Sequence, residues 1–169
     1  MNRKNRTFGM ILLALIMLIT GCSQRTATKP KVNLEVLKEQ MLSAAENLPR
    51  MEEVTEKTED ANELFAYLCD FPYEKVQEFF FLYSADSDRA AYEIAVIQVK
   101  EETDARELQE SLKEHVESRK RMFQTYAPDQ VSLIEQAIIE ERGSYITLII
   151  SDQNEQMKRV FAEAVVMEY

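Results

Sequence analysis

Few residues of this 169-residue chain have side chains suited to nucleophilic, acid–base or metal chemistry. There are two cysteines, Cys22 and Cys69, and one histidine, His115. A structural zinc site needs about four nitrogen or sulfur ligands, so a lone histidine is a poor basis for one. Cys69 stands among apolar neighbours with no cation nearby in the sequence, which predicts an inert buried thiol. We expect His115 to be a satisfied residue at the edge of a helix, with proton transfer as the alternative.

Charged residues form several clusters that could also carry chemistry. Paired acids occur at Asp86/Asp88, Glu101/Glu102 and Glu140/Glu141. A chain with 30 acidic residues produces such pairs by chance, and neighbours on a strand point to opposite faces. The run Arg119-Lys120-Arg121, followed by Phe123 and Tyr126, could bind an anion. Solvated helix charges are the favoured interpretation of that run.

Glycine is scarce, with only Gly9, Gly21 and Gly143 in the chain. Phosphate-binding loops, nucleophile elbows and dinucleotide-binding turns need glycine for positive φ angles and close backbone approach. After the first 21 residues Gly143 stands alone, so none of these loops can be built. We therefore predict no catalytic residue, no metal site and no cofactor.

The first 21 residues have the composition of an export signal. Three basic residues lie within the first six positions, and an unbroken apolar run extends from Met10 to Ile19. A spanning helix needs ~20 apolar residues, so this run is too short for a stable membrane span.

The residues Ile19-Thr20-Gly21-Cys22 resemble the lipobox of bacterial lipoproteins. In that family the cysteine receives a diacylglycerol through a thioether, and cleavage occurs just before it. The resemblance implies that Cys22 is the lipidated first residue of the mature chain, attached to the outer face of the plasma membrane. Two acyl chains give a stable anchor where one is marginal. The alternative is an ordinary signal peptide, or an uncleaved anchor, with a chance cysteine.

The predicted domain organisation follows from this leader. Residues 1–21 are the signal peptide, residues 22–32 the lipidated cysteine and a polar tether, and residues 33–169 a single domain. Removing residues 1–21 takes away three of the 20 basic residues and none of the 30 acidic ones, which leaves a formal charge of −13. Such acidity argues for a domain that stands off an anionic bilayer, and against nucleic acid as a partner.

Periodicity predicts mixed secondary structure. The uninterrupted apolar run at residues 79–83 indicates a strand over residues 76–83 that is covered on both faces, with a buried helix as the alternative. The expected helices cover residues 34–48, 61–70, 104–126, 128–135 and a C-terminal segment after residue 152. The expected strands cover residues 76–83, 92–100, 137–141 and 145–151.

The remaining segments are assigned from local signals. Residues 51–60 are acid-rich and are expected to form a solvated connection. Capping boxes are predicted at Asp104/Glu107 and Asp152/Glu155. The predicted fold class is α+β, with two leading helices followed by the order β-β-α-α-β-β-α and a mostly antiparallel sheet covered by helices.

Several short segments carry a resemblance to a known family. They are Tyr92–Val96, Ser118–Lys120 with Phe123, Tyr126–Gln130, Gly143–Tyr145 and Ser151–Asp152. From about Glu63 onward the chain resembles uncharacterised lipoproteins of Gram-positive bacteria that are known only as a domain of unknown function. Their pattern has an EIAVFK strand, a helix closing on F..YAPE, and GNYV before another strand. The resemblance implies lipoprotein character and an α+β fold, and implies no activity.

Three functions are compatible with these observations. The favoured one is a non-catalytic lipoprotein that binds an envelope protein or wall component, with Tyr126 and Asp129 as contact residues; Tyr126 could instead belong to the core. The second is a small-ligand carrier, whose pocket between sheet and helices would be lined by Phe79, Phe81, Tyr83 and Tyr92. The third is an enzyme of unrecognised type that uses His115 or a carboxylate pair.

Overall fold

The computed structural model describes residues 31–166, and the chain from Val32 onward forms one compact unit. The predicted signal peptide, Cys22 and most of the predicted tether lie outside the described residues. No helix in the described part is long and apolar enough to cross a membrane.

A five-stranded antiparallel sheet with strand order β1-β2-β3-β5-β4 forms the middle layer of the unit. Its strands are β1 (Met51–Thr55), β2 (Val76–Ser84), β3 (Glu93–Val99), β4 (Ile138–Arg142) and β5 (Tyr145–Ile150). This architecture confirms the α+β class and the two predicted antiparallel hairpins.

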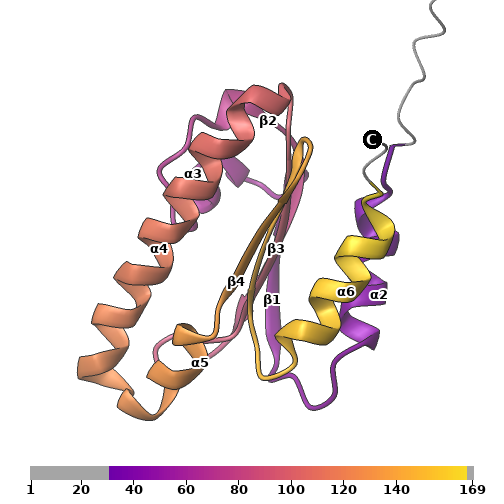
Figure 1. Ribbon diagram of the computed structural model, residues 1–169. Helices are drawn as coiled ribbons and strands as arrows, with labels where there is room; N and C mark the ends of the chain where they lie inside the picture. The colour runs from indigo at the N-terminus through magenta and orange to yellow at the C-terminus, as the bar shows by residue number, and fades with distance from the viewer. Residues whose placement is uncertain (1–30, 167–169) are drawn as a thin grey trace, which may run out of the picture. The chain divides into compact units, whose positions relative to one another are not determined.

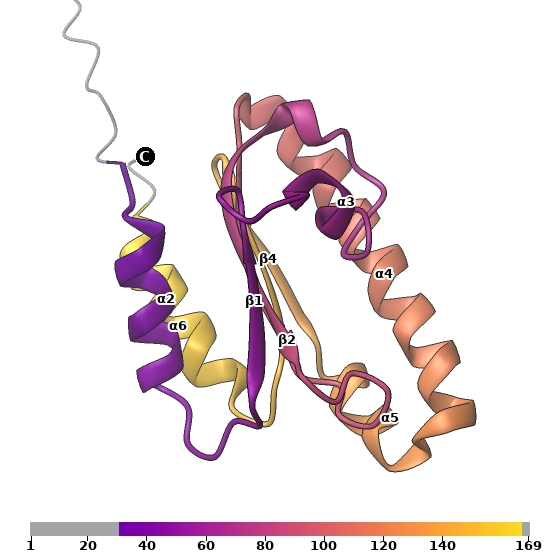
Figure 2. The ribbon, with the colours of Figure 1, turned by 180° about the vertical axis from the view of Figure 1, so that it is seen from behind.

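Helices cover both faces of the sheet (Figures 1 and 2). One face carries α2 (Leu34–Ser43) and α6 (Asn154–Ala164), and the other carries α3 (Ala61–Phe65), α4 (Ala105–Tyr126) and α5 (Val131–Glu135). Short 3-10 turns occur at Tyr73–Lys75, Glu102–Asp104 and Pro128–Gln130. The result is a three-layer sandwich with one hydrophobic core on each side of the sheet.

The uninterrupted apolar run at residues 79–83 of β2 follows from the burial of both faces of this strand. Phe79 and Phe81 enter the core under α3 and α4, whereas Phe80 and Leu82 enter the core under α2 and α6. Successive side chains of a strand point to opposite faces, so a central strand between two helical layers must be apolar on both. The predicted two-sided strand is confirmed, and the alternative of a buried helix is wrong.

The acid-rich segment at residues 51–60 is the main error of the sequence-based prediction. Met51–Thr55 forms the edge strand β1, which pairs with β2 so that Val54 lies opposite Phe81. Val54 is buried, while Glu53 is exposed and accepts a hydrogen bond from Lys38 of α2 at 2.6 Å. An edge strand tolerates acidic residues because only one of its faces and one of its sides must be covered. A strand therefore separates the two leading helices.

Both predicted capping boxes are wrong. Asp104 precedes α4 without a side-chain cap and pairs with Lys75 at 3.1 Å. Gln153, also without a side-chain cap, occupies the N-cap of α6, and its backbone N–H donates to Ser151 Oγ at 3.1 Å. The helices predicted over 34–48 and 61–70 end earlier, at residues 43 and 65. Gly143 adopts the predicted left-handed turn conformation, with φ of 59°.

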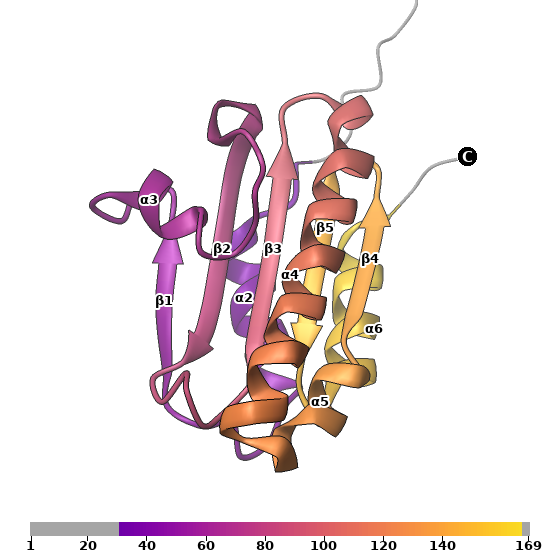
Figure 3. The ribbon, with the colours of Figure 1, turned by 90° about the vertical axis from the view of Figure 1, so that its left-hand side faces the viewer.

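On the face that carries α3, α4 and α5, the helices pack over the two edges of the sheet and leave a site over its middle strands. α4 packs over β4 and β5, whereas α3 packs against β1 (Figure 3). β2 and β3 lie between these two contacts in the sheet. Tyr83 of β2 lies opposite Glu93 of β3, and Phe81 lies opposite Ala95, so this register brings an acidic residue onto the face beneath the helices.

Candidate functional site

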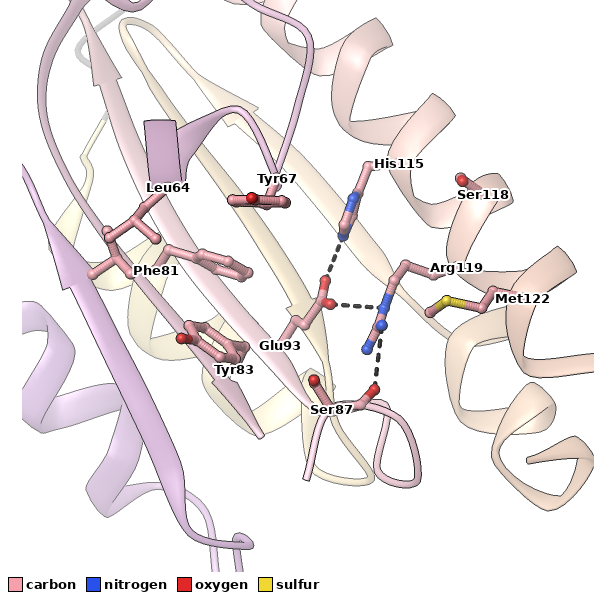
Figure 4. Close-up of a pocket in the computed structure, with 11 residues that line it drawn as sticks. Leu64, Tyr67, Phe81, Tyr83, Ser87, Glu93, His115, Ser118, Arg119 and Met122 are labelled. Carbon is pink, nitrogen blue, oxygen red and sulfur yellow. Dashed lines mark hydrogen bonds and ion pairs between the residues drawn. The ribbon is translucent and has the colours of Figure 1, made fainter. Parts of the chain in front are cut away.

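A pocket of about 470 Å³ opens on this face between α3 and α4 (Figure 4). Its volume falls within the ~300–1,000 Å³ typical of small-molecule sites. The residues that line it come from β1, α3, β2, β3, α4 and the connections after α3 and β2. They are Val54, Leu64, Tyr67, Phe81, Tyr83, Ser87, Glu93, His115, Ser118, Arg119 and Met122.

Glu93 is the central polar residue of the pocket. Its side chain is only 4% exposed, yet it contacts two basic side chains of α4. Oε2 lies 2.6 Å from Nε2 of His115, and Oε1 lies 2.8 Å from Nε of Arg119. His115 and Arg119 are four residues apart, so they project from one face of the helix toward the same carboxylate.

Arg119 is held on several sides. Its guanidinium lies 4.5 Å from the centre of the Phe123 ring, and its Nη1 donates to the carbonyl oxygen of Ser87 at 3.4 Å. Its side chain is 12% exposed and that of His115 is 11% exposed. The interpretation of Arg119 as a solvated helix charge is therefore wrong, because the sheet supplies a buried carboxylate that the helix sequence alone does not reveal.

The rest of the pocket is largely apolar. Phe81 and Tyr83 lie side by side on β2, with ring centres 5.3 Å apart. Tyr67 and Met122 stand on opposite sides of the opening, and both are exposed, at 79% and 37%. Leu64 lines the side nearer α3. The pocket thus has an apolar body and one charged end.

The predicted lining of a ligand pocket is half right. Phe81 and Tyr83 line the pocket. Phe79 packs instead in the core, edge-on against Phe65, with ring centres 5.1 Å apart. Tyr92 is not a lining residue either. Its hydroxyl lies near Asp152, and burial together with this carboxylate raises its pKa.

The thiol of Cys69 is buried, and burial raises its pKa to about 12. A thiol with this pKa is protonated at neutral pH, and the predicted burial of Cys69 is confirmed, while its lack of reactivity stays a prediction. Within residues 31–166, no group of three or more histidine, cysteine, aspartate or glutamate side chains could hold a metal ion.

Tyr126 and Asp129 lie at the junction between α4 and the following 3-10 turn, outside the pocket. Tyr126 is 74% exposed, so the alternative that it belongs to the core is wrong. Asp129 is exposed and accepts a hydrogen bond from Nε2 of Gln130 at 3.1 Å. A contact of these residues with a partner stays a prediction.

Sequence reasoning missed Glu93 as a site residue. Two signals pointed to it: Glu93 is the only acid of β3, whose other residues except Gln98 are apolar, and His115 and Arg119 share a helix face. Neither signal shows that this strand and this helix meet, and that information comes only from the fold.

Residues 49–151 match a family described as Domain of unknown function (DUF4358). The chain belongs to this family. No curated protein and no solved structure matches it. The DUF4358 match spans all five strands and every lining residue of the pocket. Glu93 and Arg119 line the pocket and Phe123 packs against Arg119, and all three lie within the matched residues 49–151.

Proposed function

We propose that this DUF4358 protein is a lipid-anchored binding protein of the bacterial cell envelope, whose domain binds a small ligand in the pocket around Glu93. The proposal favours the small-ligand function over a protein or wall partner. The observation that carries it is the buried Glu93–His115–Arg119 cluster at one end of an apolar pocket. An apolar cavity with a few converging polar groups is the usual form of a ligand site.

Stability alone is a weak explanation for this cluster. Replacing a buried ion pair with well-packed apolar residues is often neutral or stabilising, because desolvation of the charges costs as much as their attraction contributes. Here the charges also border a cavity, where apolar packing is incomplete. A role in binding accounts for both the charges and the cavity.

Native mass spectrometry of the mature protein, purified from its own cells, tests the binding function. We expect a small molecule to be retained by the wild type. Met122→Trp places a larger side chain in the pocket and should abolish retention, whereas Gln124→Trp, at an exposed position of the same helix, should preserve it. A wild-type mass that equals the lipidated chain alone would contradict the proposal.

The anchor is supported by the lipobox-like residues that end at Cys22. Cys22→Ser should prevent incorporation of labelled fatty acid and release the protein from the membrane fraction. A Cys22→Ser protein that stayed membrane-bound and still incorporated fatty acid would rule out this anchor.

The exposed aromatic ring of Tyr126 favours a second candidate function, binding of an envelope protein or wall component at the end of α4. A photo-crosslinking amino acid at position 126 should then capture one reproducible product in intact cells, and the same group at exposed Glu114 should not. Equal capture at both positions would argue against this surface.

The His115–Glu93 contact is the observation that favours an enzyme. A carboxylate that binds one imidazole nitrogen fixes the orientation of the ring for proton transfer. In that case the retained molecule should be converted slowly by the wild type, while His115→Gln should bind it unchanged. Equal conversion by both proteins would exclude this role for His115.

A further inference from the structure

We propose that the ligand is a carboxylate amphiphile, a small molecule with an apolar body and one carboxylate head that Arg119 binds. This inference rests on the proposed function and names the ligand class for the same pocket. Two observations support the inference: the hydrogen-bond donors of Arg119 that have no partner in the pocket, and the position of the apolar surface.

The charged cluster offers a ligand the N–H groups of Arg119 rather than the carboxylate of Glu93. Both oxygens of Glu93 already contact basic side chains, and the carboxylate is 4% exposed. The two basic side chains are more exposed than the carboxylate, at 11% for His115 and 12% for Arg119. Nε2 of His115 already faces Glu93, so the N–H groups left for a ligand in this cluster are those of Arg119, and they bind it best through oxygen atoms that accept from them.

Arg119 has unused hydrogen-bonding capacity. A guanidinium has five N–H donors, and the described residues give this one a single hydrogen bond, the long 3.4 Å contact of Nη1 with Ser87. Its buried Nε lies 2.8 Å from Glu93, but the N–H is not aligned for a hydrogen bond. Among the described residues only Ser87 accepts a hydrogen bond from the terminal N–H groups of Arg119, so an acceptor on a ligand can bind there.

A carboxylate fits this unused capacity better than a neutral acceptor. Its two oxygens match the planar fork of a guanidinium and can accept two parallel, charge-assisted hydrogen bonds. Figure 4 shows the terminal nitrogens of Arg119 directed away from α4, toward the Ser87 loop and the interior of the pocket. Phe123 stacks beneath the guanidinium at 4.5 Å and holds it in that orientation.

The apolar part of the pocket requires an apolar body on the ligand. Tyr67 and Met122 are exposed on opposite sides of the opening, and Phe81 and Tyr83 line the interior. A bare anion would leave these side chains in contact with water. An alkyl or aryl body attached to the carboxylate would cover them, and burial of apolar surface is the main source of affinity in such pockets.

The acidity of the whole chain opposes anion binding but does not decide it. The formal net charge of −10 repels an anion at long range. At physiological ionic strength such interactions are screened beyond about 8 Å. Inside the pocket the guanidinium of Arg119, although it pairs with Glu93, is the positive group that a ligand carboxylate would contact directly.

Three probes with one tail and different heads test the inference: octanoate, 1-octanol and octylammonium. The full chain is reconstituted in phospholipid nanodiscs with ¹³C-labelled methionine methyl groups. Met122 reports on the pocket, while Met41 and Met157, buried in the core under α2 and α6, report on nonspecific partitioning. Octanoate should shift the Met122 signal saturably, with an affinity at least about ten-fold above that of 1-octanol.

A double variant tests the role of Arg119 without leaving a buried charge unpaired. Glu93→Gln with Arg119→Gln removes both charges together and should lower the affinity for octanoate to that for 1-octanol. The control Arg121→Gln removes a positive charge from an exposed position of the same helix and should change the affinity less than about two-fold.

The outcomes separate the ligand class from the binding function. If 1-octanol or octylammonium binds as tightly as octanoate, the pocket binds ligands but the carboxylate head is wrong. If the double variant retains the preference for octanoate, Arg119 is not the group that binds it. If octanoate leaves Met122 unshifted, the ligand class is wrong, whereas failure of the binding function itself would appear as the absence of any retained molecule in native mass spectrometry.

Discussion

Substitution of Glu93 by glutamine should destabilise the domain by about 2 kcal/mol. Glutamine keeps the shape of the side chain and one oxygen acceptor, but removes the charge that faces His115 and Arg119 at 2.6 and 2.8 Å. Removing one partner of a fully buried ion pair costs about 3–5 kcal/mol, because the other charge stays in a medium that solvates it poorly. Here both basic side chains retain some exposure at the pocket, which places the expected loss below that range.

The free energy of unfolding of residues 32–169 is measured by urea denaturation followed by circular dichroism. Arg119→Gln alone should cost a similar amount, and the double variant should cost less than the sum by about 1–2 kcal/mol, because the two residues share one contact. Glu114→Gln, at an exposed position next to His115, is the matched control and should change stability by less than about 0.5 kcal/mol.

Two results would refute this reasoning. If Glu93→Gln lowers the free energy of unfolding no more than the Glu114→Gln control does, the carboxylate is not needed to compensate His115 and Arg119. Strict additivity of Glu93→Gln and Arg119→Gln would show that the two residues do not interact in solution.

Three further predictions concern other parts of the domain. Burial raises the pKa of Cys69 to about 12, so iodoacetamide at pH 8 should modify it far more slowly in the native domain than in urea. The rate of modification is followed by mass spectrometry, and similar rates would contradict the burial of Cys69. Gly143→Ala should lower the free energy of unfolding by about 1 kcal/mol in urea denaturation, because alanine is strained at a φ of 59°. An added Cβ would meet no clash, since its nearest neighbour, on the Glu102 side chain, is 3.7 Å away. An unchanged stability would argue against this turn. Tyr126→Ser should change stability by less than about 0.5 kcal/mol, whereas Phe123→Ala should cost about 3–5 kcal/mol; equal losses would place Tyr126 in the core.

The central strands and the long helix could be predicted because each follows a clear sequence pattern, an apolar run in the strands and apolar residues at helical spacing in the helix. Phe79 to Leu82 are apolar without interruption because both faces of β2 are covered. Leu108 and Leu112 recur at helical spacing and are fully buried. β1 could not be predicted in this way, because an edge strand needs only Val54 to be fully buried and its acidic residues match a loop equally well.

The site was only partly accessible to sequence reasoning. Phe81 and Tyr83 could be placed in one pocket because alternate residues of a strand lie on the same face. Arg119 was misassigned because its environment depends on Glu93, 26 positions earlier in the sequence, and no local pattern reports such a contact. The scarcity of glycine bears only on glycine-rich binding loops, and it carries no information about a cavity between a sheet and two helices.

The most direct test of the proposed binding function is a crystal structure of the mature protein purified from its own membranes. The account predicts density for a small molecule between α3 and α4, with its polar end at Arg119 and its apolar part against Tyr67 and Phe81. A pocket that contains only water, or one that is closed by inward movement of Tyr67 and Met122, would contradict it.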